Sequence, residues 1–75
     1  MKNYKVYVIK DKLDNILYAG LTRQSLKTRF IQHCHKRNIT TNTHKIELVR
    51  DELNLNEAVI LEEMMINQYN LRSVG

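Results

Sequence analysis

The chain has 75 residues, which suits one domain with a thin core, because a chain this short buries only about 60% of the surface that its unfolded form exposes. Hydrophobic residues make up 43% and charged residues 27%, as in folded globular proteins, and the net charge of +4 favours a polyanionic partner such as nucleic acid. The lone Cys34 excludes an intrachain disulfide, no apolar run approaches the roughly 20 residues of a membrane span, and the N-terminus lacks a signal-peptide core, so we expect a cytoplasmic protein without membrane contact.

The N-terminal part of the chain predicts a β-hairpin. Residues 4–10 (YKVYVIK) are rich in β-branched and aromatic side chains, residues 11–15 (DKLDN) supply turn chemistry, and a second strand follows and ends at Gly20. Paired strands lie about 4.8 Å apart, so Tyr7 and Tyr18 can approach each other across the hairpin. Taken by itself, the pair is more simply explained as two half-buried strand tyrosines that pack together.

A first helix is predicted over residues 25–36, with Ser25 as its N-cap. The apolar residues at helical spacing are Leu26, Phe30, Ile31 and Cys34. Arg29 and His33 are four residues apart and share one face, where a basic pair could meet a phosphate, although a solvated helix arginine is the ordinary alternative. His33, Cys34 and His35 point in different directions on a helix, which argues against a structural zinc site.

The second half of the chain predicts a loop, a strand and a helix. Residues 38–43 are polar and lack periodicity, and residues 45–50 alternate as in a short strand. Asn54 or Asn56 can cap a helix that runs to about Asn70, with an apolar face formed by Ala58, Leu61, Met65 and Tyr69. We therefore expect one α+β domain over residues 1–75, in which helices flank a three-stranded antiparallel sheet made of the hairpin and one further strand.

Glu62 lies in the most apolar stretch of the protein, between AVIL and EMMI. A carboxylate near an apolar helix face loses solvation unless a cation or hydrogen bonds compensate, which favours a functional role. The alternative is a boundary position whose carboxylate reaches water. The neighbouring Glu63 is expected to face solvent.

With these positions identified, the sequence resembles the GIY-YIG nuclease family over nearly its whole length. The first family motif corresponds to Lys5-Val6-Tyr7, the second to Tyr18-Ala19-Gly20, and the helical R-x-x-x-H motif to Arg29 and His33. The third signature, A-x-x-L-E-x-x-x-I, is matched from Ala58 to Ile66 and puts Glu62 at the position of the family's metal ligand.

The resemblance implies a metal-dependent endonuclease that hydrolyses phosphodiester bonds, leaving a 5′-phosphate and a 3′-hydroxyl. The residues it assigns to catalysis are Tyr7, Tyr18, Arg29, His33 and Glu62. Glu62 would bind Mg²⁺ or Mn²⁺, because such hard cations prefer oxygen ligands. The residues expected to contact nucleic acid, with DNA favoured over RNA, are Arg23, Lys27, Arg37 and His44.

The chain also departs from the family pattern. Lys5 and Val6 replace the glycine and isoleucine of the first motif, and Ala19 replaces the isoleucine of the second. Some relatives carry a lysine just after the second motif, where this chain has Leu21 and Thr22, so its electrostatic role is either absent or taken by Arg23 or Lys27.

Two other functions fit the same sequence. One is a nucleic-acid binder that keeps the scaffold without catalysis, and the other is a protein-interaction module whose adaptable surface includes Met64 and Met65. A second copy of the chain and an inhibitor or immunity protein are the candidate protein partners.

Overall fold

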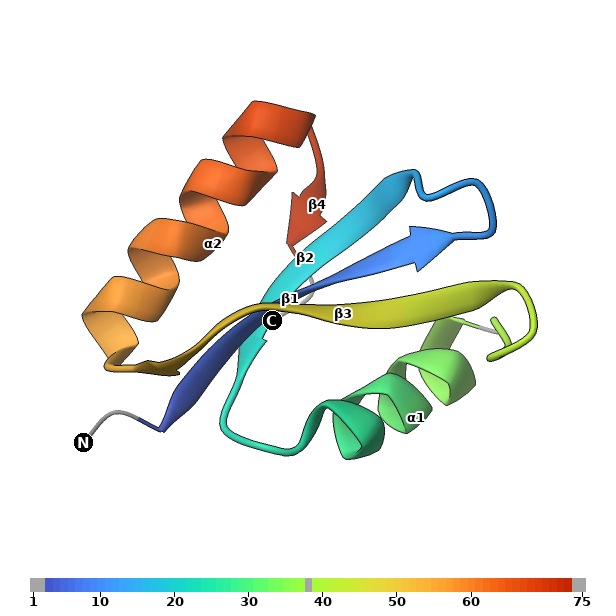
Figure 1. Ribbon diagram of the computed structural model, residues 1–75, viewed down its shortest axis with the longest axis horizontal. Helices are drawn as coiled ribbons and strands as arrows, with labels where there is room; N and C mark the ends of the chain where they lie inside the picture. Colours follow the sequence, from blue (N-terminus) through green and yellow to red (C-terminus); the bar gives the residue numbers. More distant parts are fainter. Residues whose placement is uncertain (1–2, 38, 74–75) are drawn as a thin grey trace.

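The computed structural model describes residues 3–37 and 39–73. In chain order they form a hairpin, a helix, a strand, a second helix and a short final strand (Figure 1). The elements are β1 (Tyr4–Asp11), β2 (Ile16–Thr22), α1 (Leu26–Arg37), β3 (His44–Leu53), α2 (Leu55–Tyr69) and β4 (Arg72–Ser73). Their order in the sheet is β3-β1-β2-β4, and β1 is antiparallel to both of its neighbours.

The predicted α+β fold class is confirmed, with an antiparallel sheet of three main strands and two flanking helices. The structure adds β4, which pairs in parallel with Tyr18 and Ala19 of β2. The sequence does not predict this fourth strand, because two residues are too few to show a periodic pattern. β3 also extends beyond the predicted residues 45–50 at both ends, and Asn38 of the predicted 38–43 loop lies outside the described residues.

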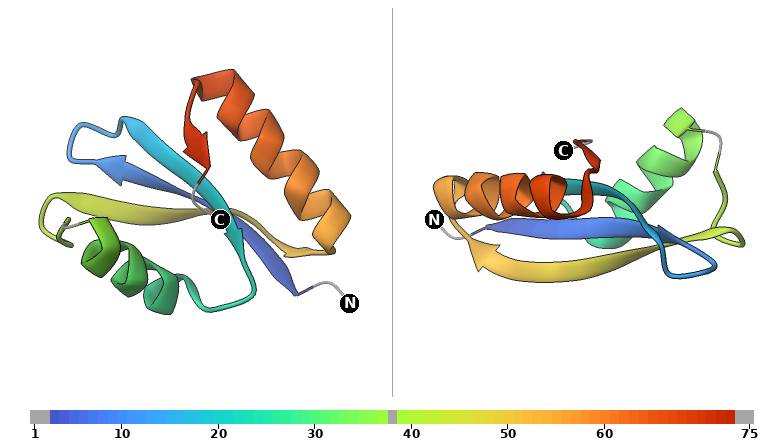
Figure 2. Two further views of the ribbon diagram at one scale, coloured as in Figure 1. Left: turned by 180° about the vertical axis from the view of Figure 1, so that it is seen from behind. Right: turned by 90° about the horizontal axis from the view of Figure 1, so that it is seen from above.

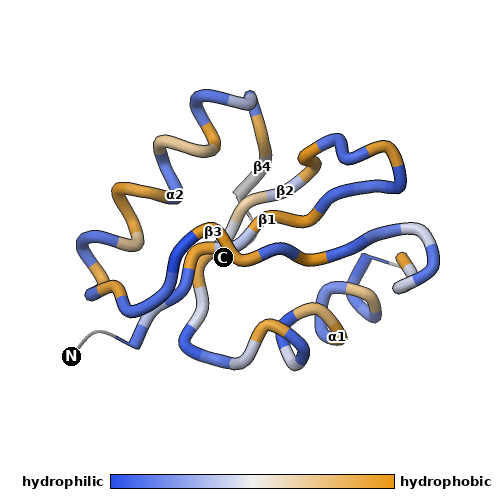
Figure 3. The backbone as a smooth tube through the Cα atoms, viewed as in Figure 1, coloured by the Kyte–Doolittle hydropathy of each residue, from blue (hydrophilic) through white to orange (hydrophobic). Residues whose placement is uncertain are grey.

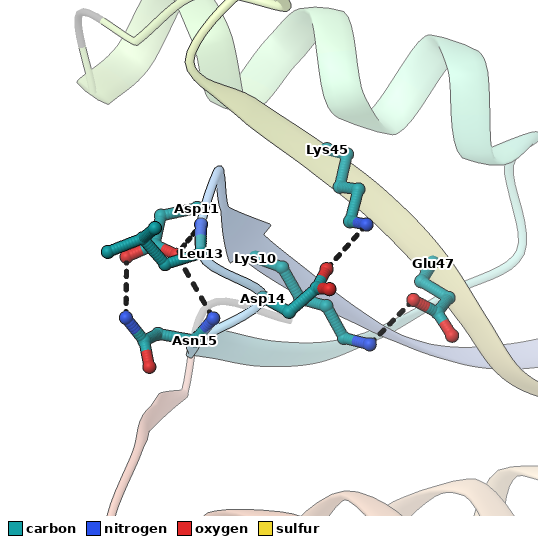
Figure 4. Close-up of polar contacts among 7 residues, drawn as sticks. All are labelled: Lys10, Asp11, Leu13, Asp14, Asn15, Lys45 and Glu47. Atoms are coloured by element: carbon teal, nitrogen blue, oxygen red, sulfur yellow. Dashed lines mark hydrogen bonds and ion pairs between the residues drawn. The ribbon is translucent and has the colours of Figure 1, made fainter.

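The hairpin turn is organised by Asp11, in agreement with the predicted turn chemistry. Its carboxylate accepts hydrogen bonds from the backbone N–H groups of Leu13 (2.8 Å) and Asn15 (3.0 Å) and from Asn15 Nδ2 (3.1 Å) (Figure 4). Asp14 completes the turn with a φ of 63°, in the left-handed region that Asp tolerates better than most residues.

Ion pairs join the hairpin to β3. Lys10 Nζ lies 2.7 Å from Glu47 Oε2, and Lys45 Nζ lies 2.5 Å from Asp14 Oδ1 (Figure 4). The first pair links neighbouring strands and the second links β3 to the turn, so the two pairs favour the observed strand order.

β1 is covered on both faces. Val6, Tyr7, Val8 and Ile9 are four consecutive residues with at most 2% of their surface exposed. Because successive side chains of a strand point to opposite faces, such a run requires cover on both sides of the sheet. The strands pass between α1 and α2, both in Figure 1 and from behind in Figure 2, and the hydrophobic segments cross at the centre of the molecule (Figure 3).

α2 covers the face that carries the small hydrophobic core. Val6 of β1 packs there with Leu53 of β3 and Ala58 of α2, and all three are buried. The partly buried hydrophobic residues around them are Tyr4, Leu21, Val49 and Leu61. The core is thin, as expected for a chain of this length.

The start of α2 is fixed by a capping box. Asn54 Oδ1 accepts a hydrogen bond from the Glu57 backbone N–H (2.8 Å), and Glu57 Oε1 accepts one from the Asn54 backbone N–H (3.0 Å). Asn54 is therefore the N-cap, and Asn56, the alternative considered from the sequence, lies inside the helix. Asn70 ends the helix in the left-handed conformation, at φ 55° and ψ 50°.

Two residues predicted for the apolar helix faces are exposed instead of packed against the sheet. Ile31 of α1 has 47% of its surface exposed and Tyr69 of α2 has 46%. On α1 the inward positions beside the strands are instead taken by polar side chains, which form the site described next.

Candidate active site

Tyr7 is at the centre of a hydrogen-bonded set on the face covered by α1. Its hydroxyl lies 2.7 Å from His33 Nε2, and Arg29 Nε donates a hydrogen bond of 3.1 Å to the same phenol oxygen. The Tyr7 and His33 rings are tilted by 56° with centroids 5.7 Å apart. Tyr7 is fully buried and His33 is 3% exposed, so a phenol, an imidazole and a guanidinium meet largely out of solvent.

The periodicity of α1 explains how two of these groups reach the strand. Arg29, His33 and Arg37 are four residues apart and therefore fall on one side of the helix. His33 is buried and both arginines are half-buried, whereas Lys36 is exposed. α1 thus turns a row of basic side chains toward the sheet, with Leu26, Phe30 and Cys34 beside it as partly buried packing residues.

Burial and neighbouring charges shift the pKa values of Tyr7 and His33 away from their usual values. Burial raises the pKa of the Tyr7 phenol, and the hydrogen bond and charge of Arg29 oppose that rise without cancelling it. The pKa of His33 falls to about 4, first because burial disfavours the charged ring and then because Arg29 and Arg37 repel it. At neutral pH the phenol is therefore protonated and the imidazole is neutral.

Tyr18 joins the set through Arg37. Tyr18 pairs across the hairpin with Ile9, which is two residues from Tyr7 in β1, so the two phenols share a face of the sheet. The guanidinium carbon of Arg37 lies 4.7 Å from the centre of the Tyr18 ring, within the range of a cation–π contact. Gly20, the direct partner of Tyr7, puts no side chain beside the phenol.

Glu62 lies on the side of α2 that faces the strands. It is half-buried in the row that contains Ala58, Leu61 and Met65, whereas Glu63 is exposed as expected. The charge of Glu62 reaches the site, because it contributes to the raised pKa of Tyr7.

A metal ion that needs few protein ligands fits this carboxylate. Within residues 3–37 and 39–73, no group of three His, Cys, Asp or Glu side chains could hold a metal ion together. Mg²⁺ commonly keeps several waters and binds proteins through one or two carboxylates plus substrate phosphate, whereas structural zinc needs four protein ligands. Glu62 therefore suits a hard cation of the Mg²⁺ type.

The remaining predicted contact residues lie elsewhere. Lys27 is exposed on α1, and exposed Arg23 is stacked 5.9 Å from the Tyr4 ring centre. Arg23 lines an open hollow of about 680 Å³ formed with Asn3, Lys5, Gln24, Asp51 and Glu52. His44 pairs with Asp11 near the hairpin turn, its Nδ1 is 2.7 Å from Thr43 Oγ1, and the structure does not bring it to Tyr7.

Two contacts of the site go beyond the sequence prediction. Arg37, expected from the sequence to contact nucleic acid, is half-buried over Tyr18. Gln32 Oε1 accepts a hydrogen bond of 3.0 Å from Arg29 Nη1 and helps to orient that guanidinium. The spacing of three residues between Arg29 and Gln32 is the signal that could have identified this second contact.

A buried phenol between an imidazole and a guanidinium, reached by the charge of one carboxylate on an α+β scaffold, is a set of groups suited to phosphodiester chemistry, as in a nuclease. The family model of the GIY-YIG catalytic domain matches residues 3–72, and the chain belongs to the GIY-YIG family. This is a family of nucleases that act on nucleic acid and are generally metal-dependent.

Comparison with curated proteins and with solved structures gives no significant match. Among the described residues, neither helix is long and apolar enough to cross a membrane.

Proposed function

We propose that this domain is a divalent-metal-dependent endonuclease that hydrolyses phosphodiester bonds, in DNA more readily than in RNA. The observation that carries the proposal is the contact set Arg29–Tyr7–His33, with hydrogen-bond distances of 3.1 and 2.7 Å around one buried phenol oxygen. A buried phenol needs a hydrogen-bond partner, but a single neutral partner would satisfy it, whereas here an imidazole and a charged guanidinium both contact the oxygen.

The raised pKa of Tyr7 argues against a free phenolate as the base. The phenol instead suits a relay, because it contacts a neutral imidazole that can accept its proton at Nε2 when the ring is protonated at Nδ1. As the attacking water loses a proton to the phenol oxygen, the phenol proton moves to His33. An anionic phosphate beside His33 offsets the charge of the arginines and raises the pKa of the ring, so substrate binding prepares the acceptor.

The other residues stabilise charge and orient the reacting groups. Arg29 neutralises negative charge that develops on the phosphoryl oxygens, where fixed donors contribute most to catalysis. Tyr18 orients the water or a phosphate oxygen. Glu62 would hold Mg²⁺ or Mn²⁺, which when bound polarises the phosphate and lowers the pKa of bound water.

Substitution of Glu62 tests the proposal, and Glu63 provides a matched control on the same helix. We expect Glu62→Ala to lower the rate of plasmid nicking in Mg²⁺ by about a hundredfold or more, since metal binding is lost. Glu63→Ala should nick at the wild-type rate, because its carboxylate faces solvent. Both variants should bind plasmid in chelator as wild type does, since the basic residues remain.

The outcome that contradicts this assignment is equal nicking by Glu62→Ala and Glu63→Ala. Wild-type protein that binds plasmid but nicks it with neither Mg²⁺ nor Mn²⁺ would instead support a non-catalytic nucleic-acid binder.

A protein-interaction surface on α2 is the second candidate function. Ile60 and Met64 of α2 are 59% and 58% exposed, and they line an open hollow with Arg50 and Leu53 of β3. Exposed apolar groups at helical spacing are typical of helix-mediated association. A concentration-dependent rise in apparent mass that Met64→Lys abolishes would support it, and a monomer at all concentrations would argue against self-association.

A further inference from the structure

Arg37 is half-buried and contacts a side chain of the site, unlike a residue of the outer surface. Its guanidinium is stacked on Tyr18, and Arg37 contributes, after Arg29, to the lowered pKa of His33. In the part of the chain that the structure describes, buried Nε of Arg37 makes no hydrogen bond. A guanidinium N–H can only donate, so an acceptor is needed to satisfy it, and an anionic oxygen forms the strongest such hydrogen bond.

Arg29 and Arg37 are too far apart along α1 to bind the same phosphate. Each helical residue advances about 1.5 Å, so the eight residues between Arg29 and Arg37 span roughly 12 Å. Arg29 donates hydrogen bonds to the Tyr7 oxygen and to Gln32, whereas the guanidinium of Arg37 makes a cation–π contact with Tyr18. Each guanidinium is thus fixed beside a different tyrosine, at opposite ends of the His33 row.

The geometry points to Arg37 as a second phosphate-binding residue, which binds a phosphate of the same substrate strand further along from the one that is cut. The inference rests on the proposed nuclease function and extends it to the substrate class: a strand with several successive phosphates, in preference to a single phosphodiester. In this arrangement Tyr18 supports the flat face of the guanidinium and leaves its edge for the anion.

Binding measured in chelator tests this subsite without turnover. The probes are inorganic phosphate and a thymidine tetranucleotide, titrated into wild type, Arg37→Gln, Arg37→Lys and Arg29→Gln. We expect Arg37→Gln to weaken tetranucleotide binding about tenfold, the effect of losing one charge-assisted contact, and to leave phosphate binding within about twofold. Arg29→Gln should weaken both ligands.

Lys36→Gln, added as a control, and Arg37→Lys help to interpret the result. Lys36→Gln removes the same charge from an exposed neighbour and should leave tetranucleotide binding within about twofold. Arg37→Lys keeps the charge but loses the planar donor edge, so its affinity should fall between those of wild type and Arg37→Gln, and it replaces Arg37→Gln if that variant does not fold.

The inference is overturned if wild type does not bind the tetranucleotide, if Arg37→Gln binds it as tightly as wild type, or if Arg37→Gln weakens both ligands alike. Plasmid nicking is recorded in parallel. If tetranucleotide binding depends on Arg37 but the protein does not nick plasmid, the nuclease proposal fails and the phosphate subsite stands. If the protein nicks plasmid but tetranucleotide binding does not depend on Arg37, the subsite fails and the nuclease proposal stands.

Discussion

At the level of single residues, the surroundings of Tyr7 decide the chemistry of the site. The phenol is fully buried, and burial is the largest cause of its raised pKa. Arg29 opposes this effect through a hydrogen bond and its charge, while Glu62 adds to it. The balance leaves a protonated phenol in contact with a neutral imidazole, which favours a proton relay over direct base catalysis.

The lowered pKa of His33 predicts a specific loss of stability in acid. An unfolded histidine titrates near pH 6.5, whereas His33 in the folded state has a pKa of about 4. The unfolded chain therefore binds the extra proton first, and the free energy of unfolding falls as the pH drops from about 6.5 to 4, by of order 2 to 3 kcal/mol. Urea unfolding at steps across this range measures the loss.

His33→Gln is the control for this acid effect. Glutamine cannot take up the proton, so the fall in unfolding free energy between pH 6.5 and 4 should be clearly smaller in this variant. The pKa values of Asp11 and Asp14 are lowered below 3.8 by contacts with Asn15 and Lys45 respectively, so their contributions are lost at still lower pH. An identical acid profile in wild type and His33→Gln would contradict the assignment.

Helical spacing made part of the site predictable from the sequence. A separation of four residues is enough to put Arg29 and His33 on one side of α1, and the structure shows this arrangement. Arg37 extends the same row, but basic residues at the C-terminal end of a helix are common on solvated surfaces, so spacing alone does not identify its contact. Its place over Tyr18 depends on tertiary packing between α1 and the hairpin.

At the level of elements, α2 shows how local signals set the limits of a helix. The capping box at Asn54 and the left-handed Asn70 fix its two ends. Between them, Ala58, Leu61, Glu62 and Met65 recur at helical spacing on the side that faces the sheet. The helix thus carries a core residue and the candidate metal ligand on one stripe, so its start position determines where Glu62 lies.

Substitution of the N-cap should therefore weaken α2. We expect Asn54→Ala to lower the free energy of unfolding by about 1 kcal/mol, because the Glu57 backbone N–H loses its acceptor. For a domain of this size the melting temperature should fall by about 4–8 °C, which calorimetry or circular dichroism measures. Asn56→Ala, inside the helix, should change stability by only a few tenths of a kcal/mol.

The strands were predictable where their residues alternate and less so elsewhere. Tyr4–Asp11 and Ile16–Thr22 follow the expected hairpin closely. β3 continues to Leu53 through irregular pairing with β1, and Glu52 has a φ of 54°, features that no alternation pattern indicates. β4 exists through its pairing with β2, a contact between residues distant in sequence.

At the level of the whole molecule, basic charge is divided between two environments. Arg29 and Arg37 are half-buried in the site, whereas Arg23 and Lys27 are exposed. In the proposed mechanism the inner arginines act on particular phosphates. The outer residues can add attraction for any nucleic-acid backbone, independent of base sequence.

The exposed Arg23 and Lys27 should increase the salt dependence of nucleic-acid binding. We expect Arg23→Gln and Lys27→Gln each to reduce the slope of log Kd against log salt by about 1, the value for one lost phosphate contact. Lys45→Gln should change the slope less, because Lys45 is already paired with Asp14. Fluorescence anisotropy on a duplex at several salt concentrations measures the slopes, and equal slopes in all four proteins would exclude this role.

The two-sided burial of β1 links the folding of this protein to its chemistry. Val6 points into the aliphatic core under α2, and the next residue, Tyr7, points to the polar set under α1. A shift of one position in this strand would exchange them, sending the hydroxyl into the core and an aliphatic group to the imidazole. A single-residue insertion or deletion within β1 would thus disrupt the core and the polar set together, because both depend on the register of one strand.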